Sequence, residues 1–153
     1  MKIIDFLHKD AILTDLKATD KKSVIHELSK PLSRLADIDH VQLVKVLTER
    51  EKLGSTGIGR GIGIPHGKLK HLKSNGILGF GLSHKGVDFE SMDRLPTHIF
   101  FTLITSEDST SLHLKLLSRI SWILKDDMIK EKLINVFQRD EVIKIISDND
   151  KAF

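Results

Sequence analysis

The sequence predicts a single α/β domain over residues 1–153, with a mixed β-sheet of about five strands flanked by helices on both faces. The two clearest strand patterns, 76–83 and 97–104, lie in the middle of the chain, with helical patterns on both sides of them. The second is apolar on both faces, as a central strand with layers on either side requires. A chain of 153 residues is also long enough for one domain with a substantial core.

The first element predicted is a helix over residues 20–35, with Asp20 or Thr19 as its N-cap. Pro31 falls inside this segment, and it should kink or interrupt the helix because proline lacks a backbone N–H group. The apolar residues recur at helical spacing and predict one buried stripe: Val24, Ile25, Leu28, Leu32 and Leu35.

A second helix should begin behind Asp39 and end near Lys52, where Gly54 supplies a stop signal. Arg50 falls in phase with its apolar stripe, which invites two interpretations. The side chain could extend along the edge of the stripe into solvent, or it could face inward and wait for an anion beside the glycine-rich segment that follows. The stripe itself comprises Leu43, Val46, Leu47 and Leu53.

The strands are joined by a long connection, residues 85–96, that could carry a short edge strand. After the second strand come helical patterns at 110–125, 127–138 and 141–147, the last with Asp140 as its expected cap. Helices before and after a strand-rich centre are typical of layered α/β or α+β domains.

Composition excludes several classes of function. The net charge of +3 comes from 24 basic and 21 acidic residues spread over the whole length, which argues against nucleic-acid binding. The chain has no cysteine, so disulfides and cysteine-based catalytic or metal sites are excluded. Its first ten residues do not resemble a secretory signal, and no apolar stretch could cross a membrane. We therefore expect a cytoplasmic protein without direct membrane insertion.

Residues 54–67, GSTGIGRGIGIPHG, place six glycines around one Pro-His pair. Their spacing fits neither the Walker phosphate loop nor the dinucleotide fingerprint. The strict alternation of glycine predicts an extended strand with one bare face, which a neighbouring backbone could approach closely. Along such a strand the other face would carry Ile58, Arg60, Ile62, Ile64 and His66.

His66 is the candidate that this segment singles out. Pro65 fixes its own backbone and keeps the preceding residue extended, which sets the orientation of His66 in advance. His113 is the second candidate, because it lies in the first turn of a helix and on its inner stripe. It could instead be an ordinary buried histidine bonded to a carbonyl. No histidine pair has zinc-site spacing, so we expect neither a metal nor a cofactor.

The segment TEREKLGSTGIGRGIGIPHGKL, residues 48–69, resembles the active-site region of EIIA components of the bacterial phosphotransferase system, of the fructose, mannitol and nitrogen-regulatory type. The resemblance extends over nearly the whole chain and includes SEDSTSLHLKLL, which contains His113. The sequence of the glycine segment is most similar to that of the nitrogen-regulatory branch. Arg60 and Gly63 depart from the usual pattern, which has a small or neutral residue and an alanine there.

The resemblance implies a phosphoryl carrier in which Nε2 of His66 is phosphorylated by an HPr-like phosphocarrier protein. It assigns Arg50 and His113 to support of the phosphate, and it implies regulatory target proteins or a IIB domain as further partners. The loop expected to offer its amides to the phosphate comprises Gly54, Ser55, Thr56, Gly57, Gly59 and Gly61. Two alternatives remain open: a sugar-transport IIA subunit that passes phosphate to a IIB domain, and a non-catalytic anion-binding module.

Overall fold

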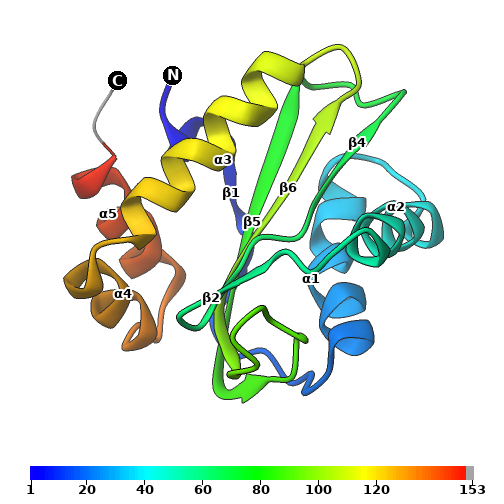
Figure 1. Ribbon diagram of the computed structural model, residues 1–153. Coiled ribbons are helices and arrows are strands. Elements are labelled where there is room, and N and C mark those ends of the chain that lie inside the picture. Colours follow the sequence, from blue (N-terminus) through cyan, green and yellow to red (C-terminus); the bar gives the residue numbers. More distant parts are fainter. Residues whose placement is uncertain (151–153) are drawn as a thin grey trace.

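A six-stranded mixed sheet lies between two layers of helices in the computed structural model, which describes residues 1–150 (Figure 1). The order of elements is a 3₁₀ turn η1 (Ile3–Asp5), β1 (Leu7–Leu13), α1 (Lys21–Leu35), α2 (His40–Lys52), β2 (Gly57–Gly59), β3 (Ile62–Gly63), β4 (His66–Leu69), β5 (Gly76–Val87), β6 (Thr97–Ser106), α3 (Thr110–Leu124), α4 (Asp127–Ile134) and α5 (Arg139–Asn149). The predicted α/β class, with a mixed sheet and helices on both faces, is confirmed.

Strand β6 organises the sheet, whose strand order is β1-β5-β6-β3-β2. It pairs antiparallel with β5 along one edge and parallel with both β3 and β4 along the other. In this register His66, the first residue of β4, lies opposite Leu103. The short strands β3 and β4, which begin within the glycine-rich segment, are therefore fixed by a long central strand.

Side chains of β6 alternate between two hydrophobic cores, one on each face of the sheet. Phe101 belongs to the core shared with α3, α4 and α5, where its ring packs edge-on against Phe80 with centroids 5.2 Å apart. Phe100 belongs to the core shared with α1 and α2, where it packs in the same way against Phe89. Because both faces are covered, β6 is buried on both faces and its central side chains are mainly apolar, as its sequence predicts.

The first two helices form as predicted. The carboxylate of Asp20 caps α1 by accepting the Ser23 amide at 2.8 Å, and Asp39 caps α2 in the same way. The expectation that Pro31 interrupts the first helix is wrong: α1 continues to Leu35. Proline removes only one backbone hydrogen bond there, and the flanking Leu28 and Leu32 remain buried in the core.

Three further expectations differ from the structure. Leu53 does not face inward but is 85% exposed, because it follows the end of α2, where the helical spacing no longer applies. Gln138 rather than Asp140 is the N-cap of α5, which begins earlier than its apolar pattern suggests, and Asp140 lies in the first turn. Residues 88–96 form no edge strand; β5 instead extends to Val87.

The alternating glycine segment is not one strand but a tight hairpin of β2 and β3 followed by β4. The chain reverses at Gly59, Arg60 and Gly61, which all have positive φ angles. Ile58 and Ile62 consequently do not share a face, since Ile58 is 47% exposed and Ile62 is buried. Alternation in sequence cannot distinguish a long strand from a hairpin whose turn is also rich in glycine.

A buried ion pair joins α3 to both ends of the described chain. The Arg119 guanidinium donates to Asp150 at 2.6 Å and to the Met1 carbonyl, and Asp150 also accepts the amide of Ile3. Arg119 and Asp150 are only 5% and 6% exposed. This ion pair therefore fixes the N-terminal turn and the end of α5 against the helix that carries His113.

Replacing Arg119 with Met should lower the free energy of unfolding by about 3–5 kcal/mol, because Asp150 would remain buried without its cation. Urea denaturation measures this change. The second substitution Asp150→Asn should recover part of the loss, and Lys115→Met, an exposed control on the same helix, should change stability by less than about 0.5 kcal/mol. Wild-type stability of Arg119→Met would contradict a stabilising role.

Candidate active site

The His66 imidazole is held by the backbone of its own segment. Its Nδ1–H group donates to the carbonyl of Ile64 at 2.7 Å, across the intervening Pro65. Ile64 is 3% exposed and donates its own amide to the Thr56 carbonyl. With the proton on Nδ1, the Nε2 atom keeps its lone pair and is the nucleophilic nitrogen of the ring.

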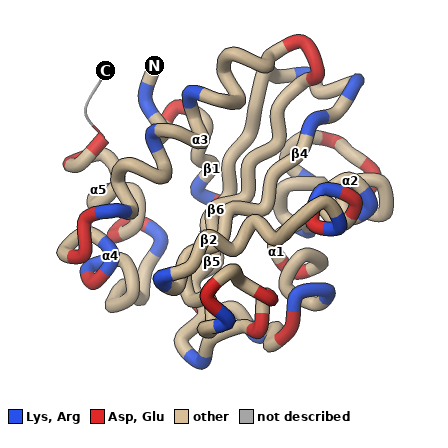
Figure 2. The backbone as a smooth tube through the Cα atoms, in the orientation of Figure 1, with Lys and Arg blue, Asp and Glu red and all other residues tan. Residues whose placement is uncertain are grey.

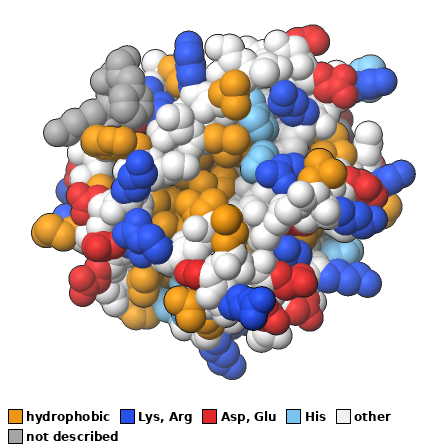
Figure 3. All heavy atoms as spheres, in the orientation of Figure 1, with side chains coloured by type: hydrophobic (Ala, Val, Ile, Leu, Met, Phe, Trp, Pro, Cys, Tyr) orange, Lys and Arg blue, Asp and Glu red, His pale blue; other side chains and the backbone are white. Residues whose placement is uncertain are grey.

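His66 lies in an open cavity of about 580 Å³ between α2, β4 and the first turns of α3. Its lining is apolar with a few charged groups, and comprises Val46, Glu49, Arg50, Leu53, His66, Gly67, Lys68, His113, Leu114 and Leu117. On the face drawn in Figure 3, histidine side chains lie beside a hollow of hydrophobic side chains, with Lys and Arg at the edge. An apolar cavity with few convergent polar groups is typical of binding and active sites.

His113 contributes the second imidazole of the cavity. It lies in the first turn of α3, is 6% exposed, and its ring centroid is 5.4 Å from that of His66 in an edge-on arrangement. The Nδ1 atom is bonded to the buried Thr105 hydroxyl at 2.7 Å, not to a carbonyl. When that hydroxyl donates, Nε2 of the neutral ring carries the proton and is the nitrogen able to donate to a ligand.

Burial and nearby positive charge keep both rings neutral. The pKa of His66 is lowered mainly by burial and further by Arg50, although the Ile64 carbonyl and the Glu51 charge oppose this. The pKa of His113 is lowered to about 4 by burial, with additional contributions from His66 and Lys68. A neutral imidazole is the form that can act as a nucleophile.

Arg50, in the last turn of α2, lines the cavity beside His66. Its Nη1 atom donates to the carbonyl of Gly54 at 2.9 Å, which holds the side chain over the start of the glycine segment. Gly67 allows α2 to pack closely against β4, since a Cβ atom at Gly67 would lie 2.6 Å from Cγ1 of Val46. Of the two interpretations of Arg50, the structure therefore favours the one that places it at the site.

The structure does not bring the expected phosphate loop into the cavity lining. The Thr56 amide donates to the Glu51 carboxylate, and the Gly57 amide donates to Ser55 Oγ at 3.0 Å. Gly59 and Gly61 belong to the hairpin turn, away from the lining residues. The Thr56 and Gly57 amides therefore have partners inside the protein, and none of the six loop residues is among those that line the cavity.

The sequence did not single out Lys68 and Glu51, although both lie at or beside the site. Lys68 follows His66 by two residues in β4, lines the cavity, and donates to the Thr110 hydroxyl at 3.1 Å. Its position on the same face of the strand is a signal that strand periodicity could have provided. Glu51 is 8% exposed, and nothing in the pattern of α2 marks a carboxylate for burial.

Known proteins similar in sequence and structure identify the family of this chain. Residues 5–149 match the family described as "Phosphoenolpyruvate-dependent sugar phosphotransferase system, EIIA 2". The chain belongs to this EIIA family. It is 40% identical over 134 residues to a nitrogen regulatory protein of Bradyrhizobium diazoefficiens, which covers 87% of this chain and 86% of that one.

Two other relatives place the chain within the family. A solved structure of the nitrogen regulatory protein IIA-Ntr from Neisseria meningitidis superposes with a TM-score of 0.88 at 31% identity, over 93% of this chain and 97% of the other. The fructose-specific EIIABC component of Bacillus subtilis is 36% identical over 99% of this chain, which spans only 24% of that protein. The chain is thus an EIIA most similar to nitrogen regulatory proteins.

The two departures from the family pattern have physical explanations in this EIIA structure. A Cβ atom on Gly63 would lie 3.1 Å from the ring of Phe100, which leaves little room for alanine. Arg60 occupies the hairpin turn, where its side chain pairs with Asp127 and its carbonyl accepts from Lys130 Nζ at 2.7 Å. Arg60 therefore joins the hairpin to α4.

Charged residues are dispersed over the surface of the protein. Figure 2 shows acidic and basic residues interspersed over helices and loops, while the central strands carry few of them. Among residues 1–150, no helix has the length and hydropathy to cross a membrane. In the same part of the chain, no three His, Asp or Glu side chains are grouped so that they could hold a metal ion.

The low pKa of His113 predicts a measurable pH dependence. The unfolded chain should bind a proton at His113 near pH 6.5, whereas the folded protein should bind it only near pH 4. Stability from the neutral ring is therefore present above pH 6.5 and is lost as the pH falls through this window. His113→Gln should flatten this part of the stability profile, measured by denaturation, while the exposed His71→Gln should not. An NMR titration midpoint of 6.5 for His113 would contradict the expectation.

Proposed function

We propose that this EIIA protein is a phosphohistidine carrier that accepts a phosphoryl group on Nε2 of His66. The hydrogen bond from Nδ1–H to the Ile64 carbonyl, at 2.7 Å, is the observation that carries the proposal. It leaves the lone pair on Nε2, at the nitrogen not engaged by the backbone. Family membership and the open cavity around the ring support the same assignment.

The proposed transfer begins with a phosphohistidine on an HPr-like phosphocarrier protein. The Nε2 lone pair of His66 attacks phosphorus, a new P–N bond forms, and the donor's P–N bond breaks with its electron pair returning to the donor imidazole. The Nδ1 proton of His66 stays on the ring and keeps its hydrogen bond to the Ile64 carbonyl, which stabilises the positive charge that develops on the imidazole. Such a transfer depends on in-line positioning and charge stabilisation more than on covalent chemistry.

We assign Arg50 and His113 to the phosphoryl oxygens. Arg50 lines the same cavity as His66 and supplies a permanent positive charge with several N–H donors. His113, bonded through Nδ1 to Thr105, would donate through Nε2 as a neutral ring. The glycine loop, Gly54 to Gly61, would then act by placing Arg50 and His66 and by leaving room for a second protein.

We further propose a nitrogen or metabolic regulatory role in the cytoplasm, with target proteins that respond to the phosphorylation state. Support comes from the relatives named nitrogen regulatory proteins, which match this chain over nearly their whole length. The second candidate is a sugar-transport IIA subunit that passes phosphate to a IIB domain, which the likeness to a fructose-specific EIIABC component favours. Onward transfer to a fructose-system IIB domain at a rate equal to the first transfer would favour transport.

Incubation with an HPr-like phosphocarrier bearing a radiolabelled phosphoryl group should yield an acid-labile, base-stable adduct on His66. His66→Ala should abolish labelling and leave the fold intact, because a half-buried ring at a cavity edge contributes little to the core. His71→Ala, a substitution of an exposed histidine nearby, serves as the matched control and should label normally. Labelling of His66→Ala at the wild-type level would overturn the assignment, and no labelling of any variant would favour an anion-binding module.

Arg50→Lys should slow transfer by about tenfold to a hundredfold, because lysine cannot reproduce the planar set of donors on the phosphoryl oxygens. Rapid-quench measurement of the first transfer gives the rate, and urea denaturation should give a stability close to that of the wild type. The exposed Arg34→Lys, at the end of α1, is the control and should transfer at the wild-type rate. A variant of Arg50 that transfers normally but unfolds easily would make Arg50 a purely structural residue.

A further inference from the structure

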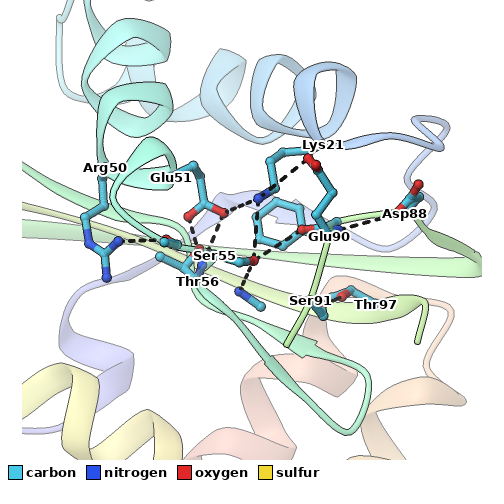
Figure 4. A network of polar contacts seen from close by, with 12 residues as sticks. Lys21, Arg50, Glu51, Ser55, Thr56, Asp88, Glu90, Ser91 and Thr97 are labelled. Carbon is cyan, nitrogen blue, oxygen red and sulfur yellow. Dashed lines mark hydrogen bonds and ion pairs between the residues drawn. The ribbon is translucent and has the colours of Figure 1, made fainter. Parts of the chain in front are cut away.

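Near the end of α2, a partly buried lysine joins three segments of the chain (Figure 4). Lys21, the first residue of α1, places its ammonium 3.2 Å from the Glu51 carboxylate and 3.5 Å from Ser55 Oγ. The same ammonium lies over the ring of Phe89, 4.9 Å from its centroid. The side chains of Lys21 and Glu51 are only 18% and 4% exposed, so solvent screens this ion pair weakly.

Glu51 connects this ion pair to the backbone that holds His66. Its two carboxylate oxygens accept the Thr56 amide at 3.2 and 3.0 Å. The Thr56 carbonyl accepts the Ile64 amide at 3.0 Å, and the Ile64 carbonyl accepts the Nδ1–H of His66 at 2.7 Å. The Lys21–Glu51 ion pair and the hydrogen bonds that follow it thus connect the Lys21 ammonium to the imidazole.

The same carboxylate also restrains Arg50. Glu51 and Arg50 are consecutive in the last turn of α2, and they bind the two ends of the short segment that follows. Arg50 holds it at the Gly54 carbonyl, and Glu51 holds it at the Thr56 amide. In Figure 4 the Glu51 carboxylate points toward Thr56 and Lys21, and Arg50 lies on the side of Glu51 away from Lys21. Movement of Glu51 would therefore displace both Arg50 and His66.

We propose that Lys21 is a positioning residue for phosphoryl transfer: by neutralising Glu51 it fixes the Thr56–Ile64 backbone and so the ring tautomer of His66 and the position of Arg50. This inference rests on the proposed function for its kinetic consequence, but its structural consequence belongs to the unphosphorylated protein. Without Lys21, the Glu51 carboxylate is a buried charge without a cation, and it must take up a proton or turn toward water. Either change weakens its hold on the Thr56 amide.

Lys21→Met tests the proposal directly, with Lys22→Met as its matched control at the next, exposed position of α1. Long-range ¹H–¹⁵N NMR correlations of the unphosphorylated protein report the His66 tautomer and its pKa. We expect Lys22→Met to keep the wild-type Nδ1–H tautomer and Lys21→Met to lose its preference for it. Lys21→Arg should restore it, and Lys21→Gln, which keeps a neutral donor to Glu51, should be intermediate.

Transfer from the radiolabelled HPr-like donor gives the second measurement. Lys21→Met should lower kcat by about tenfold to a hundredfold and leave KM within about twofold, because the groups act on the transferred phosphoryl and not on docking. A purely structural role would lower the unfolding midpoint and leave the tautomer and kcat of the folded protein unchanged. That result would overturn the proposal, as would failure of Lys21→Arg to rescue either readout.

The two measurements separate this inference from the proposed function. If the wild-type protein takes up no phosphoryl group but Lys21→Met still changes the His66 tautomer, the carrier function fails and the positioning role stands. If the wild type is labelled and Lys21→Met matches it in tautomer and kcat, the positioning role fails and the carrier function stands. Should Lys21→Met not fold, Lys21→Gln decides the question by the same two readouts.

Discussion

One hydrogen bond, from Nδ1–H of His66 to the carbonyl of Ile64, determines what the rest of the site can do. An imidazole in water exchanges its proton between two nitrogens, and only the bond made by one nitrogen selects the other as nucleophile. The Ile64 carbonyl can fix the tautomer of His66 because Pro65 lies between the two residues and restricts the backbone there. The pairing of β4 with β6 then holds this short unit in a parallel register opposite Leu103.

The His66 ring must also remain neutral beside the cationic side chains that line the same cavity, Arg50 and Lys68. Burial is the main cause of its lowered pKa. Arg50 and the surrounding apolar lining both lower the pKa of His66, while Glu51 and the Ile64 carbonyl raise it. The opposing effects keep the lone pair available and retain the positive charge that the proposed phosphoryl group would need. Three layers contribute: α2 supplies Arg50, the sheet supplies His66, and α3 supplies His113. The sheet brings together residues that are distant in sequence.

Helical elements were predictable because capping and apolar spacing are local signals. Asp20 and Asp39 mark their helix starts correctly, and the two apolar strands were recognised from their composition. Strand β1 was missed because its exposed stretch, residues 8–10, is polar, and it pairs only with the distant β5. His66 and His113 could be singled out from backbone chemistry and helix phase, and Arg50 from its phase. The buried ion pair of Lys21 and Glu51 could not, since its partners lie on different helices.

The glycines illustrate why a motif can be recognised before its physical basis is clear. The family resemblance implies amides open to a phosphate, but the Thr56 and Gly57 amides have partners within the protein. What the glycines permit is close approach: β4 passes against Val46 of α2 at Gly67, and β3 passes against Phe100 at Gly63. Backbone placed this tightly brings the end of α2 beside His66, so the proposed phosphoryl site consists of side chains that the glycines allow to meet. The entropy cost of so many glycines is offset by this geometry, which bulkier residues would prevent.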